Sequence, residues 1–227
     1  MTSLPPIAVF DLDGTLADTA PDLIATLNRI MDREGLPRVQ LEDARELIGA
    51  GARAMVSRGF EQAGLELTPE HLDELFIDFL AIYAAHLCDG SRLFPGVEAS
   101  LDQLEARGFT LAVCTNKVVG HSVQLLEALG VAGRFAAICG RDSFPYFKPD
   151  PRHLTLTIEQ AGGDPARAVM VGDSRTDIAT AKAAGIPVVA VTFGYTDVPV
   201  RDLEPDAVID GFDELAAAVK RIEQRWN

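Results

Sequence analysis

The sequence contains little cysteine, few basic residues and no long hydrophobic run, and each shortage excludes a class of protein. Its three cysteines, Cys88, Cys114 and Cys139, are odd in number and far apart. This spacing argues against a disulfide framework and favours ordinary thiols in a reducing compartment. The sequence has only 20 lysines and arginines but 34 acidic residues, which gives a formal net charge of −14. Because nucleic acids and anionic membranes bind exposed basic surface, we expect neither as a partner.

No stretch of the sequence is apolar for long enough to predict a membrane-spanning helix. The run Ile7–Phe10 is also too short for a secretory signal, and no lysine or arginine precedes it. We therefore expect a cytoplasmic protein. Hydrophobic residues make up 48% of the 227 residues and charged residues 24%, as in ordinary globular proteins. A chain of this size suits one large domain, or a core domain that carries a smaller one.

Short runs rich in β-branched residues recur along the chain and alternate with helical patterns. Continuous apolar strands that alternate with amphipathic helices predict a parallel sheet with helices on both faces. The predicted strands are Ile7–Phe10, Phe109–Cys114, Ala136–Cys139, Ala168–Val171, Val188–Val191 and Ala207–Ile209. The predicted helices are Val97–Ala106, Val118–Leu129, Pro151–Ala161, Thr176–Ala184 and Phe212–Ile222.

The stretch from Leu16 to Asp89 interrupts this alternation with helical patterns and no convincing strand. Apolar residues repeat at helical spacing between Leu72 and Tyr83, and Thr68-Pro69 supplies an N-cap followed by a proline at the first helical position. The sequence therefore predicts a helical insertion. We place a core domain over residues 1–16 and 94–227 and a cap domain over residues 17–93.

Two acidic residues, Asp11 and Asp13, directly follow the first predicted strand in the segment Asp-Leu-Asp-Gly-Thr-Leu. Ligands of parallel sheets gather beyond the carboxyl ends of the strands, so both carboxylates lie where binding sites form. The alternative is a polar turn that only satisfies backbone groups. A calcium-binding loop of the EF-hand type does not fit, because Gly14 comes too early.

Three later segments also lie at the ends of predicted strands. Thr115 and Asn116 offer a hydroxyl and an amide to phosphate oxygens, and Lys148 offers a positive charge. Asp173 and Asp177 open a predicted helix. They complete an oxygen-ligand site for a hard cation such as Mg²⁺, or cap the helix, or do both.

Taken together, these segments resemble the haloacid dehalogenase superfamily of phosphotransferases. The resemblance rests on the order Asp-x-Asp-Gly-Thr from Asp11, Thr115, Lys148, and Gly-Asp-x-x-x-Asp from Gly172. It covers nearly the whole chain and implies an α/β fold, with a Rossmann-like three-layer core and a helical cap of the C1 type. Three segments, Phe10 to Thr19, Lys148 to Leu154 and Val191 to Tyr195, are most similar to phosphoglycolate phosphatases.

The resemblance implies roles for the four acidic residues. Asp11 would attack phosphorus to give an aspartyl-phosphate, and Asp13 would protonate the leaving oxygen and later deprotonate water. A Mg²⁺ cofactor would be held by the Asp11 carboxylate, the Asp13 backbone carbonyl and Asp173. Asp177 would lie behind these ligands.

The same resemblance implies that Thr115, Asn116 and Lys148 bind the remaining phosphate oxygens of a small phosphorylated metabolite. Arg53 lies in the predicted cap, and our hypothesis is that it pairs with a carboxylate on the substrate, as phosphoglycolate would require. A solvated or structural arginine is the alternative. The surrounding Gly49-Ala-Gly51 is not a dinucleotide-binding fingerprint, since no strand precedes it.

Several alternatives follow from the same residues. A dehalogenase needs neither metal nor a second acid, and a regulatory phosphate-binding module would lack a catalytic acid, so both fit poorly. A sugar-phosphate mutase stays open, as do sugar phosphates, pyrophosphate and nucleotides as substrates, and the chain could be a monomer or a homodimer. The dispersed histidines lack metal-ligand spacing, and we expect them on the surface or at helix caps. They are His71, His86, His121 and His153.

Overall fold

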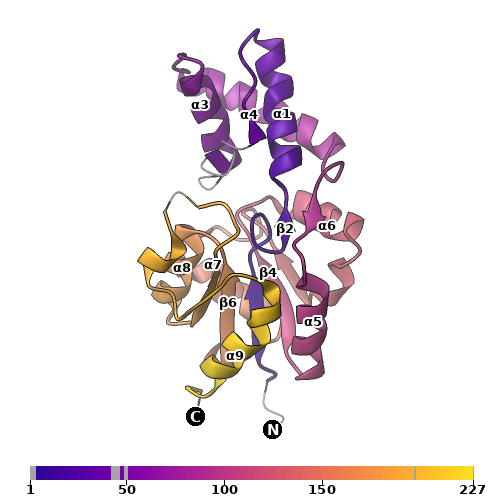
Figure 1. The fold of residues 1–227 in the computed structure, drawn as a ribbon, viewed down its shortest axis with the longest axis vertical. Coiled ribbons are helices and arrows are strands. Elements are labelled where there is room, and N and C mark those ends of the chain that lie inside the picture. Colours follow the sequence, from indigo (N-terminus) through magenta and orange to yellow (C-terminus); the bar gives the residue numbers. More distant parts are fainter. Residues whose placement is uncertain (1–3, 42–46, 49–50, 197, 227) are drawn as a thin grey trace.

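The computed structural model describes residues 4–41, 47–48, 51–196 and 198–226, and these residues form two lobes along the long axis of the molecule (Figure 1). One lobe, called here the helical lobe, contains α1 (Ala20–Arg33), α3 (Ala52–Gln62) and α4 (Pro69–Ala85). The other lobe contains the main sheet and the remaining helices. The described part of the chain begins and ends at the far end of the sheet lobe, away from the helical lobe (Figure 1).

The main sheet has six parallel strands in the order β5-β4-β1-β6-β7-β8. Strand β1 lies between β4 and β6, and Phe10 at its carboxyl end is level with Val113 on one side and Val171 on the other. The carboxyl ends of three adjacent strands therefore meet at one edge. The strands are β1 (Ile7–Phe10), β4 (Thr110–Cys114), β5 (Ala137–Cys139), β6 (Ala168–Gly172), β7 (Val188–Val191) and β8 (Ala207–Ile209).

Helices cover both faces of this sheet. Successive side chains of a strand point to opposite faces, and since the strands are apolar throughout, both faces must be buried. Ala8 and Phe10 belong to the apolar cluster that includes α5, α6 and α9, whereas Ile7 and Val9 belong to the cluster that includes α7 and α8. Burying a large apolar side chain of this kind stabilises the fold by about 1.5–3 kcal/mol. The helices are α5 (Val97–Ala106), α6 (Val119–Ala128), α7 (Pro151–Gln160), α8 (Arg175–Ala184) and α9 (Leu215–Glu223).

The predicted α/β class with a parallel sheet is confirmed, and the predicted strands and helices agree with the observed ones to within about two residues, except near residue 212. There the predicted helix is divided, because a 3-10 turn, η5 (Phe212–Glu214), precedes α9. Among the described residues, further 3-10 turns connect the larger elements of the sheet lobe. They are η2 (Ala132–Arg134), η3 (Pro165–Arg167) and η4 (Val200–Leu203).

The helical lobe packs around α4. Thr68 caps this helix as predicted, since its side chain accepts a hydrogen bond from the His71 N–H at 3.3 Å, and Pro69 follows it. Leu75, Phe79 and Tyr83 lie one or two turns apart on the buried face of α4, where α1 and α3 contact the helix. No helix in the described part of the chain combines the length and apolar character that a membrane crossing needs.

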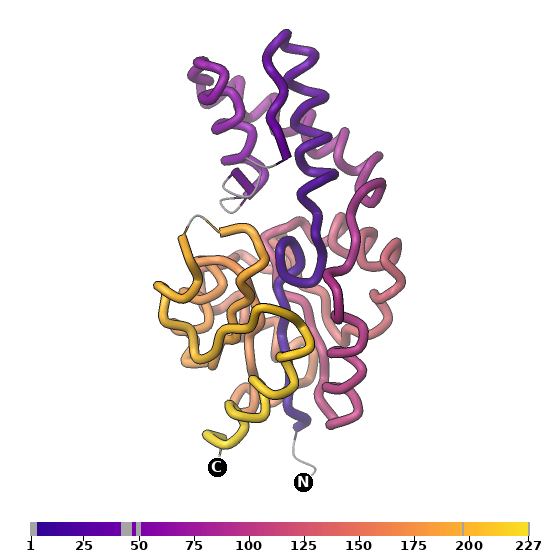
Figure 2. The backbone as a smooth tube through the Cα atoms, viewed as in Figure 1, coloured from indigo at the N-terminus to yellow at the C-terminus, as the bar shows by residue number. Residues whose placement is uncertain are grey.

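Two short strands join the lobes, and the path of the chain through them can be followed in Figure 2. Strand β2 (Ala17–Asp18) pairs antiparallel with β3 (Arg92–Leu93). The expectation of no strand between Leu16 and Asp89 is therefore wrong at β2, because a two-residue strand is too short to show a periodicity. The division into a core of 1–16 and 94–227 and a cap of 17–93 stays a prediction.

The buried Asp22, in the first turn of α1, binds Gly90 and Ser91, through which the chain leaves the helical lobe. Its carboxylate accepts hydrogen bonds from the backbone N–H groups of Gly90 and Ser91, both at 2.7 Å, and from the Ser91 hydroxyl at 2.6 Å. The two segments that link the lobes are thus tied together by side-chain as well as backbone hydrogen bonds.

Candidate active site

A cleft of about 270 Å³ lies between the two lobes, above the carboxyl ends of the central strands. Asp11 follows β1, Thr115 follows β4, and Asp173 follows β6, so three neighbouring strands bring their first polar residues to the same place. Seven of the eight predicted site residues line this cleft, and the eighth, Asp177, lies directly beside it. The seven are Asp11, Asp13, Arg53, Thr115, Asn116, Lys148 and Asp173.

Asp11 is held at the floor of the cleft by one of its two carboxylate oxygens. Its Oδ1 accepts a hydrogen bond from the Leu12 N–H at 2.8 Å and lies 2.9 Å from Lys148 Nζ. Burial, followed by repulsion from Asp177, raises the pKa of Asp11 to about 6, against the opposing attraction of Lys148. The arrangement orients the carboxylate and leaves its second oxygen outside both contacts.

Lys148 lies between Asp11 and Asp177. Its Nζ is 2.6 Å from Asp177 Oδ1, and its side chain is only 2% exposed. Burial lowers the pKa of this ammonium, but the charges of Asp11 and Asp177 more than offset that effect, and the pKa is raised overall. Lys148 is therefore a fixed positive charge beside Asp11, inside a protein whose net charge is strongly negative.

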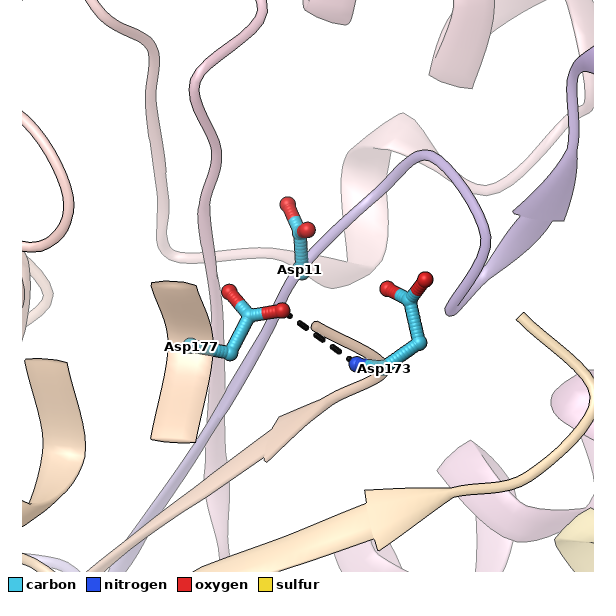
Figure 3. A group of neighbouring side chains, drawn as sticks. All are labelled: Asp11, Asp173 and Asp177. Carbon is cyan, nitrogen blue, oxygen red and sulfur yellow. Dashed lines mark hydrogen bonds between the residues drawn. The ribbon is translucent and has the colours of Figure 1, made fainter. Parts of the chain in front are cut away.

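Asp177 is fully buried, and both of its oxygens have hydrogen-bond partners. Its Oδ1 accepts a hydrogen bond from Lys148 Nζ at 2.6 Å, and its Oδ2 accepts one from the Ser174 backbone N–H at 3.0 Å. Oδ2 also accepts a hydrogen bond from the Asp173 backbone N–H at 3.2 Å, drawn as the dashed line in Figure 3. The Ser174 hydroxyl completes a capping box at the start of α8. These contacts fit the prediction that Asp177 supports the site from behind, and they also bear out the alternative that it caps the helix.

Asp173 is also held by both oxygens. The Thr15 hydroxyl donates to Oδ1 and the Tyr195 backbone N–H donates to Oδ2, each at 2.7 Å. A Cβ on Gly194 would lie 2.2 Å from the Asp173 Cβ, so only glycine allows this loop to approach so closely. Burial, followed by repulsion from Asp177 and Asp11, raises the pKa of Asp173 well above its usual value.

The three carboxylates form a compact oxygen cluster. One ligand atom from each of Asp11, Asp173 and Asp177 lies within 4.8 Å of the others. Hard divalent cations such as Mg²⁺ prefer carboxylate and carbonyl oxygens, and the mutual repulsion that raises two of these pKa values is the kind that a bound cation relieves. The residues therefore fit a Mg²⁺ ion.

Asp13 is connected to the helical lobe by Lys117. The Nζ of Lys117 is 3.0 Å from Asp13 Oδ1 and donates a hydrogen bond to the Tyr83 hydroxyl of α4 at 2.7 Å. Lys117 is 7% exposed and also lies over the Tyr83 ring, 4.4 Å from its centroid. Burial lowers the pKa of Lys117, but Asp13 and Tyr83 outweigh it and raise the pKa overall.

Thr115 and Asn116 line the cleft, and each side chain already makes one hydrogen bond within the protein. The Thr115 hydroxyl oxygen accepts a hydrogen bond from the Lys117 N–H at 3.2 Å, which leaves its own hydrogen for another acceptor. The Asn116 amide nitrogen donates to the Lys148 carbonyl at 2.9 Å, so Asn116 also fixes the loop that carries Lys148. That both side chains bind phosphate stays a prediction.

Arg53 is less closely tied to the other predicted residues. It lines the cleft, but its guanidinium pairs with Asp73 at 2.6 Å and is about half exposed, with side-chain exposure of 49%. The predicted loop around Gly49-Ala-Gly51 lies partly outside the described residues. The pairing of Arg53 with a substrate carboxylate stays a prediction.

Sequence reasoning missed some residues of the site. It gave no role to Lys117, Thr15 or Tyr195, whose partners are distant in sequence. The expectation of surface or capping histidines is wrong at His153, which is fully buried beneath Lys148. His121 is partly exposed and lines the cleft against the Tyr83 ring.

Comparisons with known proteins identify the family to which the chain belongs. The sequence family described as haloacid dehalogenase-like hydrolase matches residues 8–191. A phosphoglycolate phosphatase of Mesorhizobium japonicum is 52% identical over 210 residues, covering 92% of both chains. The phosphoglycolate phosphatase of Agrobacterium fabrum is 49% identical over 221 residues, covering 96% of this chain and 95% of its own.

A solved structure is similar over almost the same length. The crystal structure described as a predicted phosphoglycolate phosphatase from Haemophilus somnus has a TM-score of 0.85 at 33% identity, covering 96% of this chain and 99% of its own. Because the match extends through both lobes and includes the acidic edge of the sheet, the chain belongs to the haloacid dehalogenase-like hydrolases, and it is a phosphatase.

Proposed function

We propose that this phosphatase is a Mg²⁺-dependent phosphomonoester hydrolase that acts through an aspartyl-phosphate and takes phosphoglycolate as its substrate. The observation that supports it best is that Asp11 and Asp173, at the ends of the neighbouring strands β1 and β6, meet Lys148 from the loop before α7, with Asp13 facing the same cleft. The substrate is proposed from the relatives that bear the name phosphoglycolate phosphatase.

In the first step, an oxygen of the Asp11 carboxylate attacks phosphorus. The P–O ester bond breaks, its electron pair stays on the leaving oxygen, and Asp13 gives that oxygen a proton. The Leu12 N–H and Lys148 orient Asp11 from one side, so little rearrangement is needed for the attack.

In the second step, water attacks the phosphorus of the aspartyl-phosphate. Asp13, now ionised, accepts the proton of that water, the bond between phosphorus and Asp11 breaks, and inorganic phosphate leaves. Asp13 is thus the acid of one step and the base of the next. Its side chain is 22% exposed, so water can reach it.

Charge is the main obstacle to this reaction, because a carboxylate must approach a phosphate dianion. Two unit charges 4 Å apart repel by about 4 kcal/mol at an effective dielectric constant near 20. Lys148 offsets part of this repulsion. When bound by Asp11, Asp173 and the Asp13 carbonyl, Mg²⁺ would supply the remaining positive charge.

The nucleophile assignment is tested by Asp11→Asn. We expect phosphatase turnover to fall by about a thousandfold or more, since the amide cannot form the covalent bond. The matched control is Asp102→Asn, at a carboxylate that is 71% exposed on α5, outside the cleft, which should keep wild-type activity. An Asp11→Asn enzyme with turnover near wild type on every substrate would falsify the assignment.

The substrate is tested with a panel of phosphoglycolate, sugar phosphates, pyrophosphate and nucleotides. We expect phosphoglycolate to give the highest kcat/KM and to release inorganic phosphate. A higher kcat/KM on another member of the panel would contradict phosphoglycolate, and transfer of phosphate to a sugar instead of to water would favour a mutase.

A further inference from the structure

Lys117 lines the cleft directly beside Asp13. Its Nζ is 3.0 Å from Asp13 Oδ1, and Asp13 is the acid in the proposed function, on which this inference rests. A general acid donates to the leaving oxygen from about 3 Å, so Nζ lies within about 6 Å of that oxygen. In phosphoglycolate a single methylene separates the ester oxygen from the carboxylate, which matches this reach.

The other cations that line the described part of the cleft have partners other than Asp13. Lys148 lies between Asp11 and Asp177. Arg53 pairs with Asp73 on the helical lobe, and the guanidinium of Arg141 stacks 3.7 Å from the ring centroid of Phe147.

Lys117 still has hydrogen-bonding capacity toward the cleft. An ammonium group has three N–H donors. One reaches the Tyr83 hydroxyl, and the two contacts to Asp13, at 3.0 and 3.3 Å, can share a single N–H. One donor of Lys117 is then available for a substrate oxygen.

The surroundings of Lys117 make such a donor necessary for an acidic substrate. The helical-lobe side of the cleft is largely apolar, with Met55, Phe76, Phe79 and Leu80 in its lining. A carboxylate enclosed there without a charged partner would lose its hydration at a large cost in free energy. Lys117, which donates a hydrogen bond to the Tyr83 hydroxyl between the two lobes, offers such a carboxylate a charged partner.

We infer that Lys117 is a specificity-determining residue that binds the carboxylate of the substrate and selects phosphate esters of 2-hydroxy carboxylic acids. Tyr83 positions Lys117 from α4, so the selection depends on both lobes. The inference replaces Arg53 with Lys117 as the partner of the substrate carboxylate.

The test compares phosphoglycolate with ethyl phosphate, in which a methyl group replaces the carboxylate. Because Lys117 also contacts Asp13, its removal can slow every substrate, and the ratio of the two kcat/KM values cancels that shared effect. We expect the wild-type enzyme to prefer phosphoglycolate. Lys117→Met should lower the ratio about tenfold or more, because the substrate carboxylate loses a charge-assisted hydrogen bond. Lys117→Arg should restore most of the wild-type ratio.

Three results would overturn the inference. The first is a Lys117→Met ratio within twofold of wild type, which would mean that Lys117 only positions Asp13. The second is an intact Lys117→Met preference together with a collapsed preference in Arg53→Ala, which would assign the carboxylate to Arg53. The third is a wild-type enzyme without any preference, which would remove the proposed substrate as well. If Lys117→Met does not fold, Lys117→Gln gives the same comparison with a polar side chain.

Discussion

His153 is fully buried beneath the carboxyl edge of the sheet and supports the backbone of Lys148. Its Nδ1 accepts a hydrogen bond from the Lys148 backbone N–H at 3.2 Å, so the ring is neutral in the folded protein. Burial, followed by the charge of Lys148, lowers the pKa of His153 to about 4. Protonation would place a hydrogen on the accepting nitrogen and break the bond to the Lys148 backbone.

This pKa predicts a loss of stability in mild acid. The unfolded chain takes up the proton at its ordinary pKa of about 6.5, before the folded protein does. The contribution of His153 to the free energy of unfolding is therefore complete above pH 6.5 and falls as the pH drops toward 4. We expect this loss to be about 1–2 kcal/mol, measured by denaturant unfolding at several pH values.

The matched variant is His153→Asn, whose side-chain oxygen can accept the same N–H but does not titrate. All other titrating groups contribute equally to the pH dependence of unfolding in both proteins. The difference between the two pH profiles therefore isolates His153. Profiles that run parallel between pH 4 and 6.5 would contradict the assignment.

At the scale of single residues, sequence could place Asp11, Asp13, Thr115 and Asp173 correctly at the edge of the sheet, because each follows a strongly apolar strand. The sequence could not predict the partners of Lys117. Tyr83 lies on a helix of the other lobe, and no local sequence pattern indicates which side chains contact each other across a cleft.

Between strand β6 and helix α8, the close approach of Gly172 to Asp177 determines how the acidic cluster is packed. A Cβ on Gly172 would lie 2.4 Å from the Asp177 Cβ, a distance that no rotamer change can relieve. The capping box of α8 therefore packs directly against the end of the strand, which places Asp177 within reach of Lys148.

Gly172→Ala should consequently lower both stability and activity. We expect about 1–3 kcal/mol of destabilisation from overpacking, and a fall in kcat because Asp177 and Lys148 shift. Thermal unfolding and phosphatase assays measure the two effects. The control is Gly120→Ala in α6, where nothing lies within 4 Å of the added Cβ and alanine favours the helix. A Gly172→Ala protein as stable as the control would refute this account.

Elements of the main sheet were predictable because full burial leaves continuous apolar runs, and the helices between them keep a clear period. Strands β2 and β3 were not. Each has two residues, and the two strands are defined by their pairing with each other, Ala17 with Leu93 and Asp18 with Arg92, far along the chain. Pairing of this kind depends on tertiary structure, so it leaves no signal in either segment.

For the whole molecule, the formal charge of −14 and the cluster of three carboxylates predict that Mg²⁺ stabilises the fold. A ligand at about 100 times its Kd adds about 2.7 kcal/mol to the free energy of unfolding. For a chain of this length that corresponds to a rise in Tm of several degrees. Differential scanning calorimetry with and without Mg²⁺ measures it, and a chelator should reverse it.

Screening by salt alone could stabilise so acidic a protein, so NaCl at equal ionic strength is the first control. Asp173→Asn is the second, and it should abolish most of the shift, while Asp102→Asn should keep it. An equal rise in Tm for Asp173→Asn and wild type would exclude the carboxylate cluster as the binding site.

The pairing of β2 with β3 makes the start and the finish of the helical lobe neighbours in space. In topological terms the lobe is one long loop inserted into the sheet protein, and the entropy of closing a loop grows only slowly with its length. The inserted segment can therefore change in length or sequence during evolution while the residues at the carboxyl edge of the sheet stay the same. The same catalytic residues can in this way act on different substrates.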